Sequence, residues 1–560
     1  MDYKTEVAKL LAKETHLVAD DILAQIAVPP NSTLGDLAFP CFKLGKNAKQ
    51  EAETLQHKIK LPAFLSDIKV VGPYLNFFLN KSLLAEETLT VIKKEKKKYG
   101  AGKAKEKILV EYCGPNTNKP LHLGHVRNMA LGNAMCRILA FQGNTVHPVN
   151  IINDRGIHIC KSMLAYQKWG HNKKPDKKSD HYVGDYYVLY AQKVAEDPAL
   201  ETEAQQMLVA WEQGDTKVRA LWKKMNSWVL KGFAQTYKRF GITFDQEYFE
   251  SELYEAGKEV ALEGLHKGLF IKDEKGSIVA PLEAHGLPNK VLLRGDGTSV
   301  YMTQDLYLAQ QRYEDYHFDT MTYVVASEQQ LHFQQLFKIM ELLQRSYASK
   351  LYHLSYGMVH LPTGRMKSRE GTVIDADDIM NEMKALAEVE IKKRYESLSE
   401  DEIHLRAEMI GLAAIKFFML RTDAHRDIVF NPEESLSFEG ETGPYVQYTH
   451  ARACSILRKA GERKGKINYT ILNTPSEKNI ITQLMKFTDI VDDAALHYRP
   501  HVLCHYLIEL SQAFNEFYHA CPVISDDVEL MKARLHLVDA VRQVLENGLG
   551  LLGIAAPKEM

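Results

Sequence analysis

Apolar residues in the middle of the chain follow two spacings, one typical of strands and one typical of helices. Residues 108–110 (Ile-Leu-Val) form a short apolar run that predicts a buried strand. Apolar residues at the spacing of one helix face follow it, namely Leu131, Ala134, Met135, Ile138 and Leu139. Gly143 lies where this helix should end, and residues 146–153 predict a second strand. Because strand, helix and strand make one βαβ unit, we expect an α/β protein with a Rossmann-type parallel sheet.

The spacing changes elsewhere divide the rest of the chain. Residues 1–95 begin with a helical stripe and end near a predicted strand, which indicates a small N-terminal α/β domain. The Lys- and Gly-rich residues 96–107 predict a linker. The Rossmann-type domain should cover residues 108–385, with an insertion at about 165–285 where the βαβ rhythm is lost. Residues 386–560 carry apolar positions at helical spacing, so we expect an all-α C-terminal domain.

Composition limits the classes of protein and the kinds of site. The 560 residues are 45% hydrophobic and 25% charged, which is typical of a soluble globular protein with several domains. The net charge of −2 gives no general signal for nucleic acid, so any basic surface must be local. Seven cysteines without a C-x-x-C argue against a disulfide framework or a zinc site, and we expect a reducing cytoplasm and no metal site. Residues 1–4 lack a signal-peptide pattern and no apolar run reaches membrane-spanning length, so we expect neither a signal peptide nor a membrane span.

Residues 111–125 place unusual chemistry directly after the first predicted strand. Lys119, His122 and His125 converge on the start of the following helix, where free N–H groups and the positive dipole end are available. Gly124 leaves room for a ligand to approach the backbone. Two histidines three apart are also compatible with ordinary polar residues at a helix start. The combination with lysine and glycine favours a site for polyphosphate, and for charge that develops as a phosphate bond breaks.

Within these residues, the string Pro-Asn-x-x-Lys-Pro-x-His-x-Gly-His resembles the ATP-binding signature of class I aminoacyl-tRNA synthetases, in the form found in arginyl-tRNA synthetases. Residues 357–372 resemble the second class I motif, although Arg-Met-Lys-Ser-Arg at 365–369 replaces the usual Lys-Met-Ser-Lys-Ser. The resemblance covers most of the chain and is weakest in the first 90 residues and in the insertion.

The resemblance assigns roles to both motifs. It implies that Lys119 supplies the charge missing at Ser368, and it leaves open whether Lys367 or Arg369 shares that work. The implied catalytic residues are Lys119, His122, His125 and Lys367. The implied ATP-binding residues are His122, Gly124, His125, Met358, Val359, Ser368 and Arg369.

An amino-acid pocket for arginine should contain carboxylates and amide oxygens, because a guanidinium has five fixed donors. Tyr301 and Asp305 are four apart and share one face of a predicted helix, a spacing that also fits a core tyrosine beside a surface aspartate. The resemblance places both in the arginine site. The implied arginine-binding residues are Glu111, Gly114, Asn116, His122, Tyr301, Asp305 and Gln329.

Two outer regions resemble tRNA-binding parts of the family. Residues 440–452, 514–518 and 557–560 resemble the helical anticodon-binding domain, and residues 70–79 resemble the domain that contacts the tRNA elbow. Aromatic rings in these regions either stack on unpaired bases or fill the core. The implied tRNA-binding residues are Tyr74, Asn76, Tyr445, Tyr448, Arg452, Tyr518 and Met560.

The resemblance therefore implies an arginine–tRNA ligase that uses ATP with Mg²⁺. Its partners would be L-arginine, ATP and an arginine-specific tRNA, with no DNA and no membrane, and it would be a cytoplasmic monomer. The alternatives are a class I synthetase for another amino acid and a non-catalytic tRNA-binding relative. The presence of His122, Gly124, His125 and Asp305 argues against the non-catalytic alternative.

Overall fold

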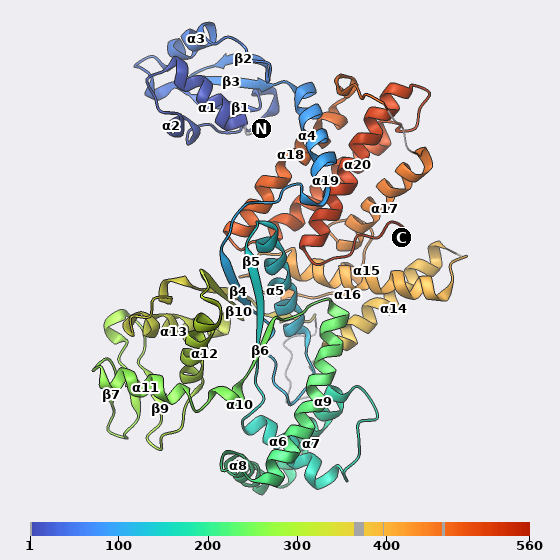
Figure 1. The fold of residues 1–560 in the computed structure, drawn as a ribbon. Helices are drawn as coiled ribbons and strands as arrows, with labels where there is room; N and C mark the ends of the chain where they lie inside the picture. Colours follow the sequence, from blue (N-terminus) through green and yellow to red (C-terminus); the bar gives the residue numbers. More distant parts are fainter. Residues whose placement is uncertain (1–2, 363–373, 396, 462–464) are drawn as a thin grey trace. The chain divides into compact units, whose positions relative to one another are not determined.

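The computed structural model describes residues 3–362, 374–395, 397–461 and 465–560 (Figure 1). Its internal contacts define two compact units. One holds residues 1–96, 453–486 and 512–544, and the other holds residues 97–452, 487–511 and 545–560. Because the C-terminal helices contribute to both units, this division does not test the predicted domain boundaries, which stay predictions.

The first unit begins with a small antiparallel sheet and helices. Its elements are α1 Tyr3–Glu14, α2 Ala19–Leu23, β1 Leu37–Pro40, α3 Ala48–Lys58, β2 Leu65–Val71, β3 Tyr74–Leu79 and α4 Lys81–Glu95. The strands pair in the order β1-β3-β2, and Gly72 has the positive φ of 58° that the tight turn between β2 and β3 requires. Val7 and Leu11 of the predicted helical stripe are buried in one cluster with Phe77. The expected small α/β fold is confirmed.

A five-stranded parallel sheet lies in the second unit. Its strands are β4 Lys107–Glu111, β5 Thr145–Ile152, β6 Gln246–Phe249, β10 Thr320–Ala326 and β11 Leu351–Tyr356, in the order β11-β10-β4-β5-β6. Helix α5, Leu123–Phe141, links β4 to β5, which confirms the predicted βαβ unit (Figure 1). The strand order reverses between β4 and β10. Ligands of doubly wound sheets bind beside such a reversal, at the carboxyl ends of the strands.

Helices fill the connection between β5 and β6. They are α6 Ile157–Trp169, α7 Ser179–Glu196, α8 Ala199–Glu212 and α9 Thr216–Phe240. Strand β6 pairs with β5 in the parallel sheet, although it lies inside the predicted insertion. The sequence did not predict it, because its four residues are too few to form a recognisable apolar run. The elements after β6 are α10 Glu250–Leu253, α11 Gly257–His266, β7 Ile271–Lys272, β8 Ile278–Ala280, β9 Lys290–Leu293, α12 Tyr301–Tyr316 and α13 Gln330–Leu342.

Helices dominate the chain after residue 374. They are α14 Ala376–Arg394, α15 Glu400–Leu420, α16 Pro432–Ser435, α17 Gly443–Ala460, α18 Pro475–Leu496, α19 Pro500–Ala520 and α20 Val528–Leu551. Two short strands, β12 Val359–His360 and β13 Ile428–Val429, pair in parallel. Among the described residues, no helix is both long enough and apolar enough to span a lipid bilayer. The predicted fold class, α/β with an all-α C-terminal part, is confirmed.

Candidate active site

A cavity of about 480 Å³ lies at the carboxyl ends of β4 and β10. The start of α5 and strand β12 also contribute to its walls. The sequence-predicted residues that line it are Glu111, Gly114, Lys119, His122, Gly124, His125, Met358 and Val359. The fold thus brings the first motif and the start of the second motif together at the place where the strand order reverses.

Three asparagines hold the loop that leaves β4. The backbone N–H groups of Cys113 and Gly114 donate to the side-chain oxygens of Asn128 (2.5 Å) and Asn150 (2.9 Å). Asn153 pairs with the loop through its backbone, since its N–H donates to Pro115 at 2.9 Å. Cys113 has a φ of 83°, a left-handed conformation that costs a non-glycine residue about 1–3 kcal/mol. These hydrogen bonds fix a strained turn beside the cavity, and the sequence reasoning missed Asn128 and Asn150.

The two histidines of the first motif are locked by backbone contacts at the start of α5. Nδ1 of His122 accepts from the Gly124 N–H, and Nδ1 of His125 accepts from the His122 N–H, each at 3.1 Å. Burial lowers the pKa of His122 to about 3 and that of His125 well below its usual value, with Lys119 acting in the same direction. Both rings are therefore neutral at pH 7, and Nε2–H is the donor that remains on each.

Lys119 lines the same cavity and lies in the field of one nearby carboxylate. Burial lowers the pKa of Lys119, and Asp375 acts in the opposite direction. Burial also raises the pKa of Asp375 to about 6. Residue Asp375 forms an antiparallel bridge with His122, and the Ala376 N–H donates to Leu121 at 2.8 Å. The first turn of α14 is thereby tied to the first motif.

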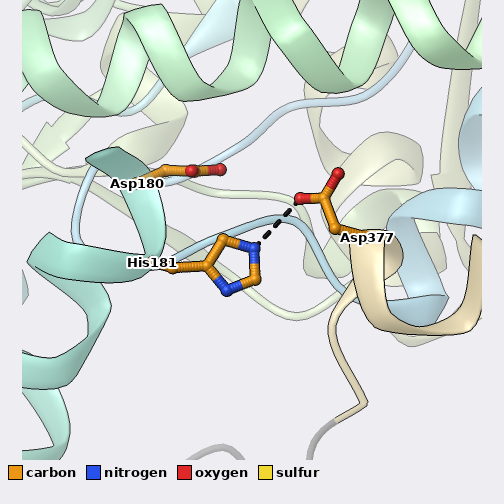
Figure 2. A group of neighbouring side chains, drawn as sticks. All are labelled: Asp180, His181 and Asp377. Atoms are coloured by element: carbon orange, nitrogen blue, oxygen red, sulfur yellow. Dashed lines mark hydrogen bonds and ion pairs between the residues drawn. The ribbon is translucent and has the colours of Figure 1, made fainter. Parts of the chain in front are cut away.

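A cluster of ionic side chains supports this region. Asp180, His181 and Asp377 come close enough to suggest a metal site, and Figure 2 shows His181 bonded to Asp377. However, Nζ of Lys178 lies 2.6 Å from Asp180 and 2.9 Å from Asp377. The ammonium supplies the positive charge that these carboxylates need. We interpret the cluster as an ion-pair network that joins α7 to α14.

Arg127 connects α5 to Gly357 and Met358, the two residues directly before β12. The guanidinium is fully buried and donates to the carbonyl oxygens of Gly357 at 2.6 Å and Met358 at 3.3 Å. It also donates to Ala424 at 3.1 Å and Arg426 at 2.8 Å. The sequence reasoning missed Arg127, and the charged and polar residues of α5 did not show by themselves which partners they have.

The predicted arginine-binding residues fall into two groups. Glu111, Gly114 and His122 line the cavity, whereas Asn116, Tyr301, Asp305 and Gln329 are not part of its lining. Helix α12 carries Tyr301, which is 65% exposed, and Asp305, whose Oδ2 lies 2.6 Å from Nε2 of His332. Glu111 forms an ion pair with Arg312 of α12. Sequence reasoning missed both His332 and Arg312.

Three predicted motif residues, Lys367, Ser368 and Arg369, lie outside the described residues, so their roles stay predictions.

The predicted tRNA-binding residues differ in exposure. Tyr74 and Tyr518 are each 41% exposed, whereas Asn76 is 3% exposed. Tyr448 accepts a 2.9 Å hydrogen bond from Arg452, whose guanidinium also lies 4.7 Å from the ring centre. Tyr445 is half-buried and Met560 is buried. Tyr74 and Tyr518 therefore have the surface that base stacking requires, and the burial of Asn76 does not favour a direct contact.

Three family models match the chain. One describes the catalytic domain of class I (R) tRNA synthetases and matches residues 88–432. The second describes the DALR anticodon binding domain and matches residues 446–560. The third describes the arginyl tRNA synthetase N terminal domain and matches residues 1–79.

Similar proteins cover almost the whole chain. The arginine–tRNA ligase of Treponema denticola is 46% identical over 98% of each chain, and that of Bacteroides thetaiotaomicron is 43% identical over 94% of this chain and 93% of its own. The solved structure of Thermus thermophilus arginyl-tRNA synthetase has 28% identity and a TM-score of 0.81 over 96% of both chains. A Plasmodium falciparum structure, at 21% identity and a TM-score of 0.78 over 96% of this chain and 94% of its own, supports the fold alone.

Proposed function

The chain belongs to the arginyl-tRNA synthetase family and is an arginine–tRNA ligase, and we propose that Lys119, His122 and His125 stabilise the transition state of arginine activation. The enzyme converts ATP and arginine into arginyl-adenylate and pyrophosphate, and then transfers the arginyl group to the 3′ end of its tRNA. The observation that carries the proposal is the pair of Nδ1 contacts that keep both imidazoles neutral. Neutral rings donate hydrogen bonds to developing phosphate charge and do not act as proton shuttles.

We assign the remaining ATP contacts to other residues that line the same cavity as Lys119, His122 and His125. Gly124 lets the triphosphate approach the backbone of α5. Met358, directly before β12, and Val359, its first residue, contact the nucleoside. Arg127 supports this assignment because it fixes the carbonyls of Gly357 and Met358 to α5. Lys367 (as a further catalytic residue), Ser368 and Arg369 would contribute from the second motif.

We propose Mg²⁺ as the companion of ATP. Within the described cavity lining, Glu111 is the one carboxylate, and its Oε2 is already paired with Arg312. Mg²⁺ usually retains several waters and binds substrate phosphates with one or two carboxylates. The phosphates of ATP are therefore its expected ligands.

Arginine recognition is assigned to the side chains that flank the cavity. Asp305 and Tyr301 would receive the guanidinium, whereas Glu111, Gly114, Asn116, His122 and Gln329 would contact its other polar groups. A carboxylate is the natural partner of a guanidinium. Asp305 already forms a 2.6 Å hydrogen bond with Nε2 of His332, so its carboxylate is placed to accept from a nitrogen donor.

The tRNA would contact both ends of the chain. We assign Tyr74 and Asn76 to the elbow, and Tyr445, Tyr448, Arg452, Tyr518 and Met560 to the anticodon side. Domain limits of 1–95, 96–107, 108–385 and 386–560 accompany this assignment. A monomer in the cytoplasm, without DNA or membrane, is proposed as well, and the seven free cysteines fit a reducing compartment.

Pyrophosphate exchange with arginine and tRNA tests the central assignment. Lys119→Met and His122→Asn should each lower kcat by about 10²–10³, because each removes a donor to transition-state charge. The exposed His285→Asn serves as the control. If Lys119→Met and His122→Asn retained wild-type kcat while folded, the proposed role of the first motif would be wrong. If Lys367→Met lowered kcat far more than Lys119→Met does, the catalytic positive charge would be assigned to the second motif.

A further inference from the structure

The guanidinium of Arg312 lies against Glu111, a carboxylate that we assign to substrate binding. Arg312 is fully buried on α12, and Glu111 at the end of β4 is 8% exposed. Nη1 of Arg312 forms an ion pair with Oε2 of Glu111. The ring of Tyr248 lies 4.8 Å from the guanidinium carbon, so an aromatic face closes another side of the cation.

Helix α12 carries a second charge on the same face. Asp305 and Arg312 are seven residues apart, which is about two helical turns, so both project to one side. Burial raises the pKa of Glu111; the Arg312 guanidinium opposes this rise, and Asp305 adds to it as a like charge. Without Arg312, the buried Glu111 carboxyl would face Asp305 with no cation beside it, and a nearby like charge opposes the ionisation of a buried carboxyl. Arg312 makes the charges alternate along the site.

We propose that Arg312 is a positioning residue for arginine recognition, which favours the ionised form of Glu111 and pairs with Oε2 so that Oε1 faces the substrate. This inference rests on the proposed role of Glu111 in arginine binding. The proposal assigns two different tasks to the two carboxylates of the pocket, Glu111 and Asp305. The Glu111–Arg312 pair has no net charge and orients a hydrogen bond, so selection of a cation depends on Asp305.

Steady-state pyrophosphate exchange on four test variants and one control variant tests the inference. Arg312→Met should raise the arginine KM at least about tenfold, the effect of one lost 1.4 kcal/mol interaction, and leave the ATP KM unchanged. Arg312→Lys keeps the charge and should restore part of the affinity. Glu111→Gln and the double variant Arg312→Met/Glu111→Gln should have similar arginine KM values, because Arg312 acts through Glu111. Arg239→Met breaks a bidentate pair with Glu408 outside the cavity lining and is the matched control.

The pH profile distinguishes positioning from support of the fold. In Arg312→Met the Glu111 carboxyl faces Asp305 without a cation, with Tyr323 and Tyr248 as the other titratable neighbours of the vacated space. Its pKa should rise further than in the wild type, where burial already raises it, so kcat/KM for arginine should recover at a higher pH in Arg312→Met than in the wild type. A general loss of packing would not produce this rise. If Arg312→Met fails to fold, the Arg312→Lys and double variants carry the comparison, since neither leaves a buried charge unpaired.

The outcomes are distinct. Wild-type arginine KM in Arg312→Met, additive losses in the double variant, or an equal rise of the ATP KM would overturn the positioning role while leaving the ligase assignment intact. An unchanged arginine KM in Glu111→Gln would remove Glu111 from the pocket and the inference with it. Arg239→Met should keep the wild-type arginine KM; a rise in its arginine KM equal to that of Arg312→Met would show that the effect is not specific to the Glu111 pair and would refute the proposal.

Discussion

Replacing Asp305 with asparagine should weaken arginine binding without unfolding the protein. Oδ2 of Asp305 lies 2.6 Å from Nε2 of His332, and its side chain is 29% exposed. Asparagine has nearly the same shape and keeps an oxygen that accepts this hydrogen bond, so the fold should remain. It lacks the negative charge that a guanidinium requires.

The size of the effect follows from burial. Breaking a fully buried ion pair costs about 3–5 kcal/mol, whereas a hydrogen bond to a charged group contributes about 1.5–3 kcal/mol. Because Asp305 is 29% exposed, water screens the pair and the smaller range applies. A loss of about 2–3 kcal/mol corresponds to a rise of roughly 30- to 150-fold in the arginine KM.

Pyrophosphate exchange in the presence of tRNA measures this rise when arginine and ATP are varied separately. The ATP KM and the melting temperature should stay close to wild type. Glu314→Gln, an exposed neutral substitution on the same helix, controls for the general charge of α12. An unchanged arginine KM in folded Asp305→Asn, or an equal rise of the ATP KM, would remove Asp305 from the arginine pocket.

Two further substitutions test the tRNA surface and the ion-pair network. Tyr518→Ala should raise the tRNA KM by about 5- to 150-fold, the equivalent of 1–3 kcal/mol of base stacking, and leave the ATP KM unchanged; a lowered melting temperature with a normal tRNA KM would make it a core ring. Lys178→Met should lower the free energy of unfolding by about 3–5 kcal/mol, because Asp180 is fully buried and would lose its cation. A metal chelator should leave the wild-type melting temperature unchanged, since Lys178 fills the cluster; a chelator-induced fall would instead indicate a bound metal.

The sequence predicted those parts of the fold whose apolar residues are regularly spaced within one continuous segment. The run at 108–110, the apolar stripe from Leu131 to Leu139 and the second strand are continuous in sequence, and their βαβ unit is confirmed. Strand β6 was hidden because its four residues alternate too briefly to show a period. Only tertiary pairing with β5 makes it a strand.

The same distinction applies to the site. The signature at 119–125 was recognisable because its helix start and its ligand groups are adjacent in the chain. Asn150 and His332 gave no comparable signal, since their partners Gly114 and Asp305 lie 36 and 27 positions away. A polar side chain becomes a support only when folding brings an unsatisfied group beside it.

Three basic residues show how distant elements are fixed around the motif. Arg127 joins α5 to the strand before the second motif, Lys178 joins α7 to α14, and Arg312 joins α12 to β4. A charge in a water-poor environment is costly unless a partner meets it with good geometry. Each cation therefore restricts the relative placement of two elements far apart in sequence. Variants of Lys119, His122 or Asp305 report on contacts with substrates only while the contacts of these three cations remain intact, because those contacts fix the elements that carry the side chains.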